Sequence, residues 1–166
     1  MRVLSPLLFM WVGLVPAATA AAPPEPVAPI ALATLTDVEV ALAQPVVFEF
    51  GTDRIRPASL ALLDAARAVL AQHPEIKIEV QVHAASAESS SAKPLHSLSE
   101  RRAAAVAQYL TSTDIAGARV HHCGYGAQRP LVPNDNDLDR ARNRRVQLVR
   151  ITTEAPCAAP TPGWQP

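Results

Sequence analysis

The sequence predicts an α/β fold, an α+β two-layer sandwich in which helices cover one face of a mixed four-stranded sheet. Residues 76–83 alternate apolar and polar side chains, which is typical of a strand with one buried face. Apolar stripes at helical spacing lie before and after that strand, at residues 60–70 and 103–110. Because the elements follow the order β-α-β-α-β-β, both helices are expected on the same side of the sheet.

The first predicted strand covers residues 46–50 (Val-Val-Phe-Glu-Phe), which are β-branched or aromatic except for one glutamate. Alternation at residues 38–42 is also consistent with a further strand directly before it. Pro57 favours the first turn of a helix. We expect this helix to end near His73, because the residue before Pro74 avoids helical backbone angles.

A second helix is expected after a Ser- and Ala-rich loop at residues 84–97. Ser97 and Glu100 have the Ser-x-x-Glu spacing of a capping box, in which two side chains accept hydrogen bonds from backbone N–H groups at the helix start. The helix is therefore predicted to begin there and to continue to about Leu110.

Two strands complete the predicted domain. The first covers residues 119–123 and is expected to stop at the Gly-Tyr-Gly run that follows, and the second covers residues 146–152. The polar loop between them contains Asn-Asp-Asn-Asp-Leu-Asp at residues 134–139, which superficially resembles a calcium-binding loop. It lacks the glycine of the sharp turn and the terminal glutamate, so we interpret it as a solvated loop with helix-capping roles.

The chain begins with the features of an export signal, residues 1–20. A short positive start precedes an apolar run at residues 3–15, and Ala-Thr-Ala at residues 18–20 has the small-x-small form of a signal-peptidase site. The apolar run is short and contains proline, so no transmembrane segment is expected in the mature chain. The predicted remainder is a proline- and alanine-rich linker (21–34), the folded domain (35–153) and a disordered proline-rich tail (154–166).

Composition and motifs exclude several classes of function. The formal net charge is zero and few residues are aromatic, so the chain has no electrostatic footprint for nucleic acid. The sequence has neither a recognisable Ser-His-acid arrangement nor a glycine-rich phosphate loop, so we expect neither an enzyme nor a cofactor. His121, His122 and Cys123 are too few ligands for a structural metal, and no second spaced pair accompanies them, so no metal site is expected.

The chain has two cysteines, Cys123 and Cys157. In an exported protein an even number permits a disulfide, which here would fix the tail to the domain. The residues leave an alternative open, namely a small buried Cys123 and a free thiol in the tail.

Two arginine pairs lie at the ends of predicted elements, in residues 98–103 (Leu-Ser-Glu-Arg-Arg-Ala) and 140–146 (Arg-Ala-Arg-Asn-Arg-Arg-Val). Forked guanidinium groups at such positions, in a chain of zero net charge, suit the recognition of carboxylates. The alternative is that these arginines are solvated caps and ion-pair partners, as surface charges often are.

A larger pattern joins these segments to others. It consists of Phe48-Glu49-Phe50-Gly51 with Ile55-Arg56-Pro57, Ile78-Glu79-Val80 with His83, residues 98–103, Gly124-Tyr125-Gly126 with Pro130, and residues 140–147. In this order, and over nearly the whole mature domain, these segments resemble the OmpA-like (OmpA/MotB C-terminal-like) domain, the peptidoglycan-associating module of diderm bacterial envelopes.

The resemblance implies a mixed sheet in which the last strand lies between the first two and runs antiparallel to the others. It also implies non-covalent binding of the diaminopimelate residue of the peptidoglycan stem peptide. In the family, an aspartate after the second strand meets the ammonium group of this ligand, and the second arginine of the Leu-Ser-x-x-Arg-Ala motif meets a carboxylate. Arg102 matches that arginine, whereas Ala84 and Ala85 stand where Thr-Asp is expected.

Three interpretations of this altered site are open. Glu88, in a lengthened loop, replaces the lost carboxylate; the domain binds the wall weakly, or binds another wall ligand, through Arg102; or it is a structural or protein-interaction module without wall binding. Asn143 and Arg144 are expected to shape the site, and Arg144 and Arg145 to anchor the loop and the last strand. The implied location is the periplasm of a diderm bacterium, facing the cell wall and near the outer membrane, with envelope proteins as further candidate partners.

Overall fold

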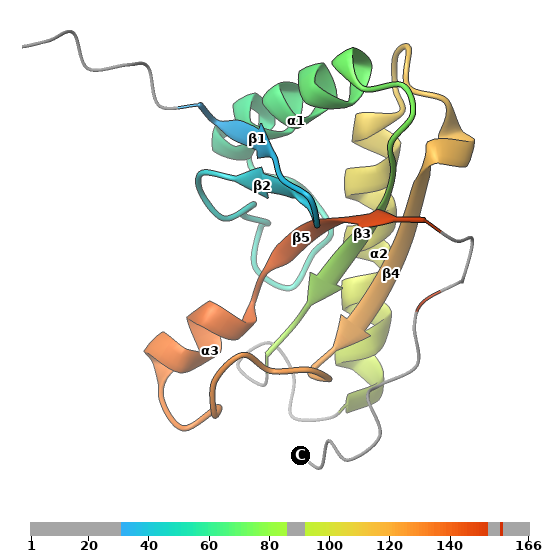
Figure 1. Ribbon diagram of the computed structural model, residues 1–166. Coiled ribbons are helices and arrows are strands. Elements are labelled where there is room, and N and C mark those ends of the chain that lie inside the picture. Colours follow the sequence, from blue (N-terminus) through green and yellow to red (C-terminus); the bar gives the residue numbers. More distant parts are fainter. Residues whose placement is uncertain (1–30, 86–91, 153–156, 158–166) are drawn as a thin grey trace, which may run out of the picture.

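The computed structural model describes residues 31–85, 92–152 and Cys157. Within these residues, helices α1 and α2 lie on one side of a sheet whose central strand is β3, and a β1–β2 hairpin lies beside β5 (Figure 1). The elements are β1 (Ala33–Leu35), β2 (Val40–Leu42), a 3-10 turn (Pro57–Ser59), α1 (Leu60–Gln72), β3 (Lys77–His83), α2 (Ala92–Leu110), a second 3-10 turn (Gly117–Arg119), β4 (Val120–Gly126), α3 (Asp137–Asn143) and β5 (Val146–Ile151).

The sheet has the predicted mixed topology. β3 pairs parallel with β4 and antiparallel with β5, where Val80 lies opposite Leu148. On the other side of β5, Glu39 forms an antiparallel bridge with Val149, so that β5 lies between β3 and the segment that leads into β2. The expectation of an inserted, antiparallel last strand is therefore confirmed.

The apolar stripes and the alternating strand meet in one core. Leu63 of α1, Val80 of β3 and Leu110 of α2 are completely buried. The first helix begins through the 3-10 turn at Pro57–Ser59 and ends at Gln72, as the prolines predicted. Burial of these stripes is the main favourable contribution to the stability of the layers.

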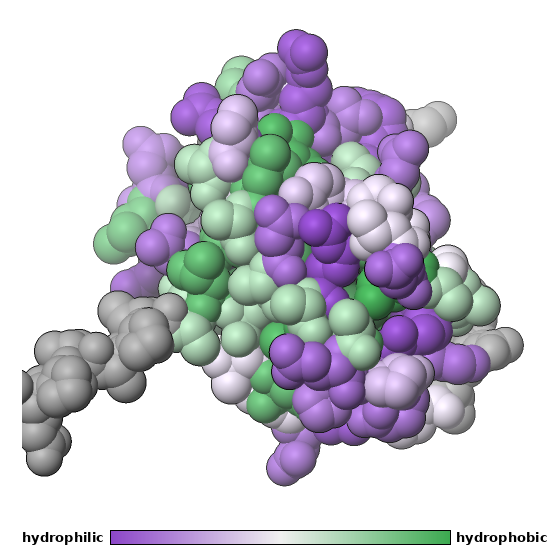
Figure 2. Space-filling view, turned by 90° about the horizontal axis from the view of Figure 1, so that it is seen from above, coloured by the Kyte–Doolittle hydropathy of each residue, from purple (hydrophilic) through white to green (hydrophobic). Residues whose placement is uncertain are grey.

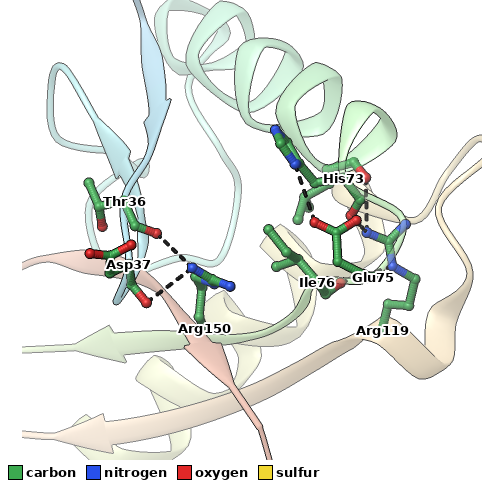
Figure 3. Close-up of polar contacts among 8 residues, drawn as sticks. Thr36, Asp37, His73, Glu75, Ile76, Arg119 and Arg150 are labelled. Atoms are coloured by element: carbon green, nitrogen blue, oxygen red, sulfur yellow. Dashed lines mark hydrogen bonds and ion pairs between the residues drawn. The ribbon is translucent and has the colours of Figure 1, made fainter.

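Two arginines outside the predicted site hold peripheral segments on the sheet (Figure 3). Arg150 of β5 donates hydrogen bonds from Nη1 to the carbonyl oxygens of Thr36 and Asp37, each at 3.1 Å, and so fixes the turn of the hairpin. Arg119 satisfies carbonyl groups around the end of α1, where a helix leaves them without intrahelical partners. Its acceptors are the carbonyl oxygens of Leu70 at 2.9 Å, His73 at 2.7 Å and Ile76 at 3.0 Å.

The predicted strand at residues 46–50 is wrong. Phe48 forms an isolated bridge with Ile55 across a turn in which Gly51 has a φ of +70°. The strand position beside β5 is taken by the β2 segment, where residues 38–42 alternate. The local sequence indicated an extended segment correctly, but β-propensity does not say which backbone the segment will pair with.

The capping box predicted at Ser97 and Glu100 is also wrong, because α2 begins at Ala92 and the preceding loop is shorter than expected. Ser97 Oγ accepts a hydrogen bond from Arg101 Nη1 at 3.0 Å within the helix. A carboxylate oxygen of Glu100 accepts one from Gly124 N of β4 at 2.6 Å. The Ser-x-x-Glu spacing therefore serves helix–sheet packing here rather than a helix start.

β4 continues through Gly124 and Gly126 instead of stopping at Cys123 as predicted. Helix α2 crosses β4 so closely that a Cβ on Gly124 would lie 2.1 Å from Glu100 N. The backbone N–H of Gly126 donates to Ser99 Oγ at 2.8 Å. The glycines therefore allow the close approach of a helix, which a sequence pattern of turn formers does not distinguish from a strand end.

Helix α3 lies in the loop that was predicted to be irregular. Asn136 Oδ1 accepts a hydrogen bond from Asp139 N at 2.9 Å and so caps the start of this short helix, as the expected capping role implied. The large apolar residue of this helix, Leu138, is exposed. Without an apolar stripe, helical periodicity gives no signal.

The predicted domain boundaries stay predictions. β1 begins at Ala33, inside the segment 21–34 that the sequence assigns to the linker. The predicted signal peptide (1–20) and all of the predicted tail except Cys157 lie outside the described residues.

At the end of the molecule with α1 and the hairpin, hydrophobic side chains form small groups separated by hydrophilic ones (Figure 2). Across the described ranges, none of the helices has the length and apolar character needed to span a bilayer.

Cys123 and Cys157 form a disulfide, with a Cα–Cα distance of 5.5 Å. The next residue in β4, Gly124, faces α2. Because successive strand side chains point to opposite faces, Cys123 points to the face of the sheet away from the helices. The bridge therefore holds residue 157 on that face.

Candidate functional site

A cavity of about 250 Å³ opens where four segments of the chain meet. Residues 45–48 form one wall, the end of β3 forms another, and Arg102 of α2 and the junction between α3 and β5 complete the lining. The junction contributes Arg144 and Arg145, so arginines from two distant parts of the sequence line one small space. Such a space attracts anions, and carboxylates match the forked geometry of arginine.

Arg102 is held in a defined position at this cavity. The residue is only 4% exposed. Its Nε donates a hydrogen bond to Thr52 O at 2.8 Å, and its guanidinium carbon lies 4.8 Å from the centroid of the Phe48 ring. A hydrogen bond and a cation–π contact together fix the orientation of the positive charge. Its predicted contact with a ligand stays a prediction.

Arg145 anchors the start of β5, as the resemblance implied. Its Nε donates to Gln147 Oε1 at 2.8 Å and its Nη2 to Arg129 O at 3.2 Å. Burial, with the positive charge of Arg129 nearby, lowers the pKa of Arg145 to about 10, so Arg145 is charged at neutral pH. Its Nη1 is buried and has no hydrogen-bond partner in the described part of the chain.

His83, at the end of β3, also lines the cavity and is 3% exposed. Its ring stacks on Tyr125, with the centroids 5.2 Å apart, and its Nδ1 lies 3.1 Å from Gln128 O. Burial and the charge of Arg145 lower the pKa of His83 to about 4, so the imidazole is neutral near pH 7. The sequence analysis used His83 only as a motif match and missed it as a polar group of the site.

Acid is expected to destabilise the domain through His83. The pKa of this residue is about 4 in the folded chain, against 6.5 for an unperturbed histidine. The unfolded state therefore binds more protons in this interval, so stability is fully present above the higher value and falls as the pH drops toward the lower one, by up to about 3 kcal/mol. Urea unfolding at a series of pH values measures this loss. A His83→Phe variant should show a clearly smaller decline, and equal declines would contradict the assignment.

Asn143 is not among the described residues that line the cavity. Its Oδ1 accepts from Leu131 N at 2.8 Å and Val132 N at 3.2 Å, and its Nδ2 donates to Val132 O at 2.8 Å and Asn134 Oδ1 at 2.9 Å. The side chain therefore anchors the loop before α3. Glu88, the predicted replacement carboxylate, lies outside the described residues.

A buried polar group on the helix-free face of the sheet was not anticipated. Glu79 of β3 is 3% exposed and accepts hydrogen bonds from Gln81 Nε2 at 2.8 Å and Tyr125 Oη at 2.9 Å. Burial and the hydrogen bond to Glu79 raise the pKa of Tyr125 to about 12. The guanidinium of Arg129 lies over the ring of Tyr125, with its carbon atom 4.4 Å from the ring centroid. These contacts position the ring that supports His83.

The histidine–cysteine run in β4 offers no thiolate, because Cys123 is in the disulfide. Within the described ranges, no three His, Cys, Asp or Glu side chains lie together as metal ligands would.

Comparisons with known proteins agree with this architecture. The chain is 34% identical over 102 residues to Outer membrane protein A of Bordetella avium, and the match covers 61% of this chain and 51% of that protein. It is 30% identical over 113 residues to the Peptidoglycan-associated lipoprotein of Rhizobium meliloti, covering 68% and 63% respectively. Peptidoglycan-binding protein ArfA of Mycobacterium tuberculosis is 28% identical over 132 residues, covering 79% of this chain and 40% of that protein. The chain thus spans less than two thirds of the length of these relatives.

Solved structures show the same fold. The peptidoglycan-associated lipoprotein of Burkholderia pseudomallei superimposes with a TM-score of 0.59 at 26% identity, covering 66% of this chain and 92% of that structure. A MotB-like protein of Desulfovibrio vulgaris gives a TM-score of 0.57 at 29% identity, covering 63% and 67%. The model of the OmpA family matches residues 47–144, which include Arg102 and most of the cavity lining. By fold, motifs and this match, the chain belongs to the OmpA family.

Proposed function

We propose that this domain binds peptidoglycan non-covalently in the periplasm of a diderm bacterium, through the diaminopimelate residue of the stem peptide. The observation that carries the proposal is the cavity at which Arg102, Arg144 and Arg145 meet. Guanidinium groups held at a small cavity suit a ligand that presents carboxylates. The relatives named for peptidoglycan support this class of ligand, and those named as outer membrane proteins support a place in the envelope.

The affinity is expected to be modest. Ala84 and Ala85, which are 2% and 1% exposed, stand where the resemblance implies Thr-Asp. Alanine does not pair with an ammonium group, and loss of one partner of a charged pair costs about 2–5 kcal/mol. A loss of this size turns a micromolar site into one that is about millimolar. Glu88 is the candidate that would restore the missing charge.

Cosedimentation of the exported chain with purified peptidoglycan sacculi tests the proposal. Arg144→Ala is expected to weaken binding by roughly tenfold, because a hydrogen-bonding charge at the cavity is lost. Arg142→Ala is the matched control. Arg142 lies two residues before Arg144, within α3, contacts Asp139 at 4.0 Å on the surface and is not among the described residues of the cavity lining.

Two outcomes would contradict the proposal. Equal losses in both variants would indicate unspecific attraction between positive charge and the wall. Failure of the unmodified chain to sediment with sacculi at low salt would favour the other interpretation, a structural or protein-interaction module of the envelope.

A further inference from the structure

We infer that the exposed ring of Phe50 is a platform on which a sugar ring of the wall's glycan strand stacks, so that the domain binds sugar-linked stem peptides more tightly than free ones. The inference rests on the proposed function, since a stem peptide in the cavity is what brings the glycan to Phe50. It adds to the charged cavity a second contact of different chemistry, which is neutral and apolar.

Phe50 is the most exposed of the large hydrophobic residues in the described ranges, at 78%. A single exposed hydrophobic residue is common on protein surfaces and by itself needs no explanation. Phe50 differs in that the turn carrying it is bonded to Arg102, which lines the cavity. The location of the ring, rather than its exposure alone, is therefore the observation that points to a ligand.

A tight, braced turn displays this ring. Thr52 N donates a hydrogen bond to Glu49 O at 3.2 Å, which closes the turn. Phe50 and Gly51 take its central positions, and the φ of +70° at Gly51 is that of a type II turn. At its base, Glu49 N donates to Arg54 O at 2.9 Å. Because these bonds already fix the backbone, a ligand that meets the ring orders little further structure.

The turn is attached to the cavity on both sides of Phe50. Arg102 Nε donates to Thr52 O at 2.8 Å, and the guanidinium carbon of Arg102 lies 4.8 Å from the centroid of the Phe48 ring. Phe48 and Thr52 are each two residues from Phe50, and two residues span at most about 7 Å. Phe50 therefore lies beside the cavity, although it is not among the described residues that line it.

The surroundings of Phe50 favour a neutral ligand group. Glu49 and Arg54 at the base of the turn pair with each other, with 3.7 Å between Oε2 and Nη1. The face of an aromatic ring is negative and attracts groups whose hydrogen atoms are partly positive. A pyranose ring presents such C–H groups on one face and keeps its hydroxyl groups at the rim. A sugar ring therefore matches an exposed aromatic face that is not flanked by an unpaired charge of this turn.

The structure of the wall places a sugar at a suitable distance. In peptidoglycan, two amino acids of the stem peptide separate the diaminopimelate residue from the muramic acid sugar. Two residues span roughly 7–10 Å when extended. A diaminopimelate residue in the cavity therefore brings the sugar within reach of the turn at Phe50.

Titration of the isotope-labelled exported chain, followed by amide chemical shifts, tests the inference. The probes are the disaccharide-linked tetrapeptide GlcNAc-MurNAc-L-Ala-γ-D-Glu-meso-diaminopimelyl-D-Ala and the same tetrapeptide with an N-acetyl cap in place of the sugars, which has the same net charge. The unmodified chain should bind the disaccharide probe roughly three- to tenfold tighter. This ratio should stay constant as salt is added, because salt screens charges and not a neutral sugar contact.

Phe50→Ala should bind the two probes equally and should bind the capped peptide as well as the unmodified chain does. The variant should fold, because the side chain of Phe50 is mostly exposed. Val38→Ala is the matched control and should keep the full ratio, since Val38 is an apolar residue that is 68% exposed and lies outside the described cavity lining. Phe50→Trp should also keep the preference, and its fluorescence should change with the disaccharide probe but not with the capped peptide.

Equal binding of the two probes by the unmodified chain would overturn the inference and leave the proposed function standing. A preference for the disaccharide probe that survives in Phe50→Ala would overturn it as well, since the sugar would then contact another part of the domain. If neither the probes nor sacculi bind, the proposed function fails and the inference fails with it.

Discussion

Arg102→Leu is expected to lower the affinity for peptidoglycan sacculi by at least about thirtyfold, the largest loss of any single change at the cavity. The side chain is almost fully buried, and Thr52 O and the Phe48 ring fix its orientation. A ligand carboxylate would therefore meet a preorganised positive charge. Substitution of Arg102 by leucine removes this charge and leaves the carboxylate unpaired. Arg102→Lys should recover only part of the loss, because lysine restores the charge but not the fork. Cosedimentation across a range of protein concentrations gives the affinities.

Arg101→Leu is the matched control for this experiment. Arg101 is the preceding residue of α2, is exposed and donates to Ser97 Oγ at 3.0 Å. Equal losses in the two variants would contradict a specific role of Arg102. Folding must be checked separately, because removal of Arg102 leaves Thr52 O without this donor and should cost about 1–3 kcal/mol of stability. A urea transition and a near-ultraviolet circular dichroism spectrum show whether the variant is still folded.

Gly124→Ala is expected to destabilise the domain severely, by more than about 3 kcal/mol, or to prevent folding. The added Cβ would lie 2.1 Å from Glu100 N, 2.4 Å from Glu100 Cα and 2.6 Å from Ser99 C. These are backbone atoms of α2, so no side-chain rotation relieves the clash and the helix must move away from β4. That movement also strains the hydrogen bonds from Gly124 N and Gly126 N to α2 side chains. Urea unfolding under oxidising conditions measures the effect.

Gly117→Ala provides the control, since nothing lies within 4 Å of a Cβ built there. This change should be nearly neutral, because alanine at an unobstructed position chiefly reduces the entropy of the unfolded chain. A Gly124→Ala variant as stable as Gly117→Ala would mean that α2 and β4 are not packed as closely as the structure has them.

The central elements were predictable because the apolar residues of each one recur at the spacing of its own secondary structure, helical in α1 and alternating in β3. α1 and β3 follow from apolar spacing, and Pro57 and Pro74 mark the helix ends through backbone sterics rather than through long-range contacts. The strand predicted at residues 46–50 failed for the opposite reason. Its backbone could pair with several segments, and the position beside β5 is filled by the β2 segment.

Local motifs failed where tertiary contacts use the same residue types. Glu100 has capping-box spacing but bonds to β4, and the glycines of β4 look like turn formers but admit a helix. At the site, Arg102, which the motif singled out, lines the cavity, and its contact with a ligand stays a prediction. Arg102, His83 and Arg145 line one cavity although they come from three separate chain segments. No local pattern in the sequence signals this arrangement.

The disulfide between Cys123 of β4 and Cys157 affects how the protein should be prepared. Thiols stay reduced in most cytoplasms, so material made there without export would carry residue 157 detached from the sheet and would present a different surface on that side. Secretion into an oxidising compartment, followed by titration of free sulfhydryls, would verify that every molecule in an assay is cross-linked as the structure has it.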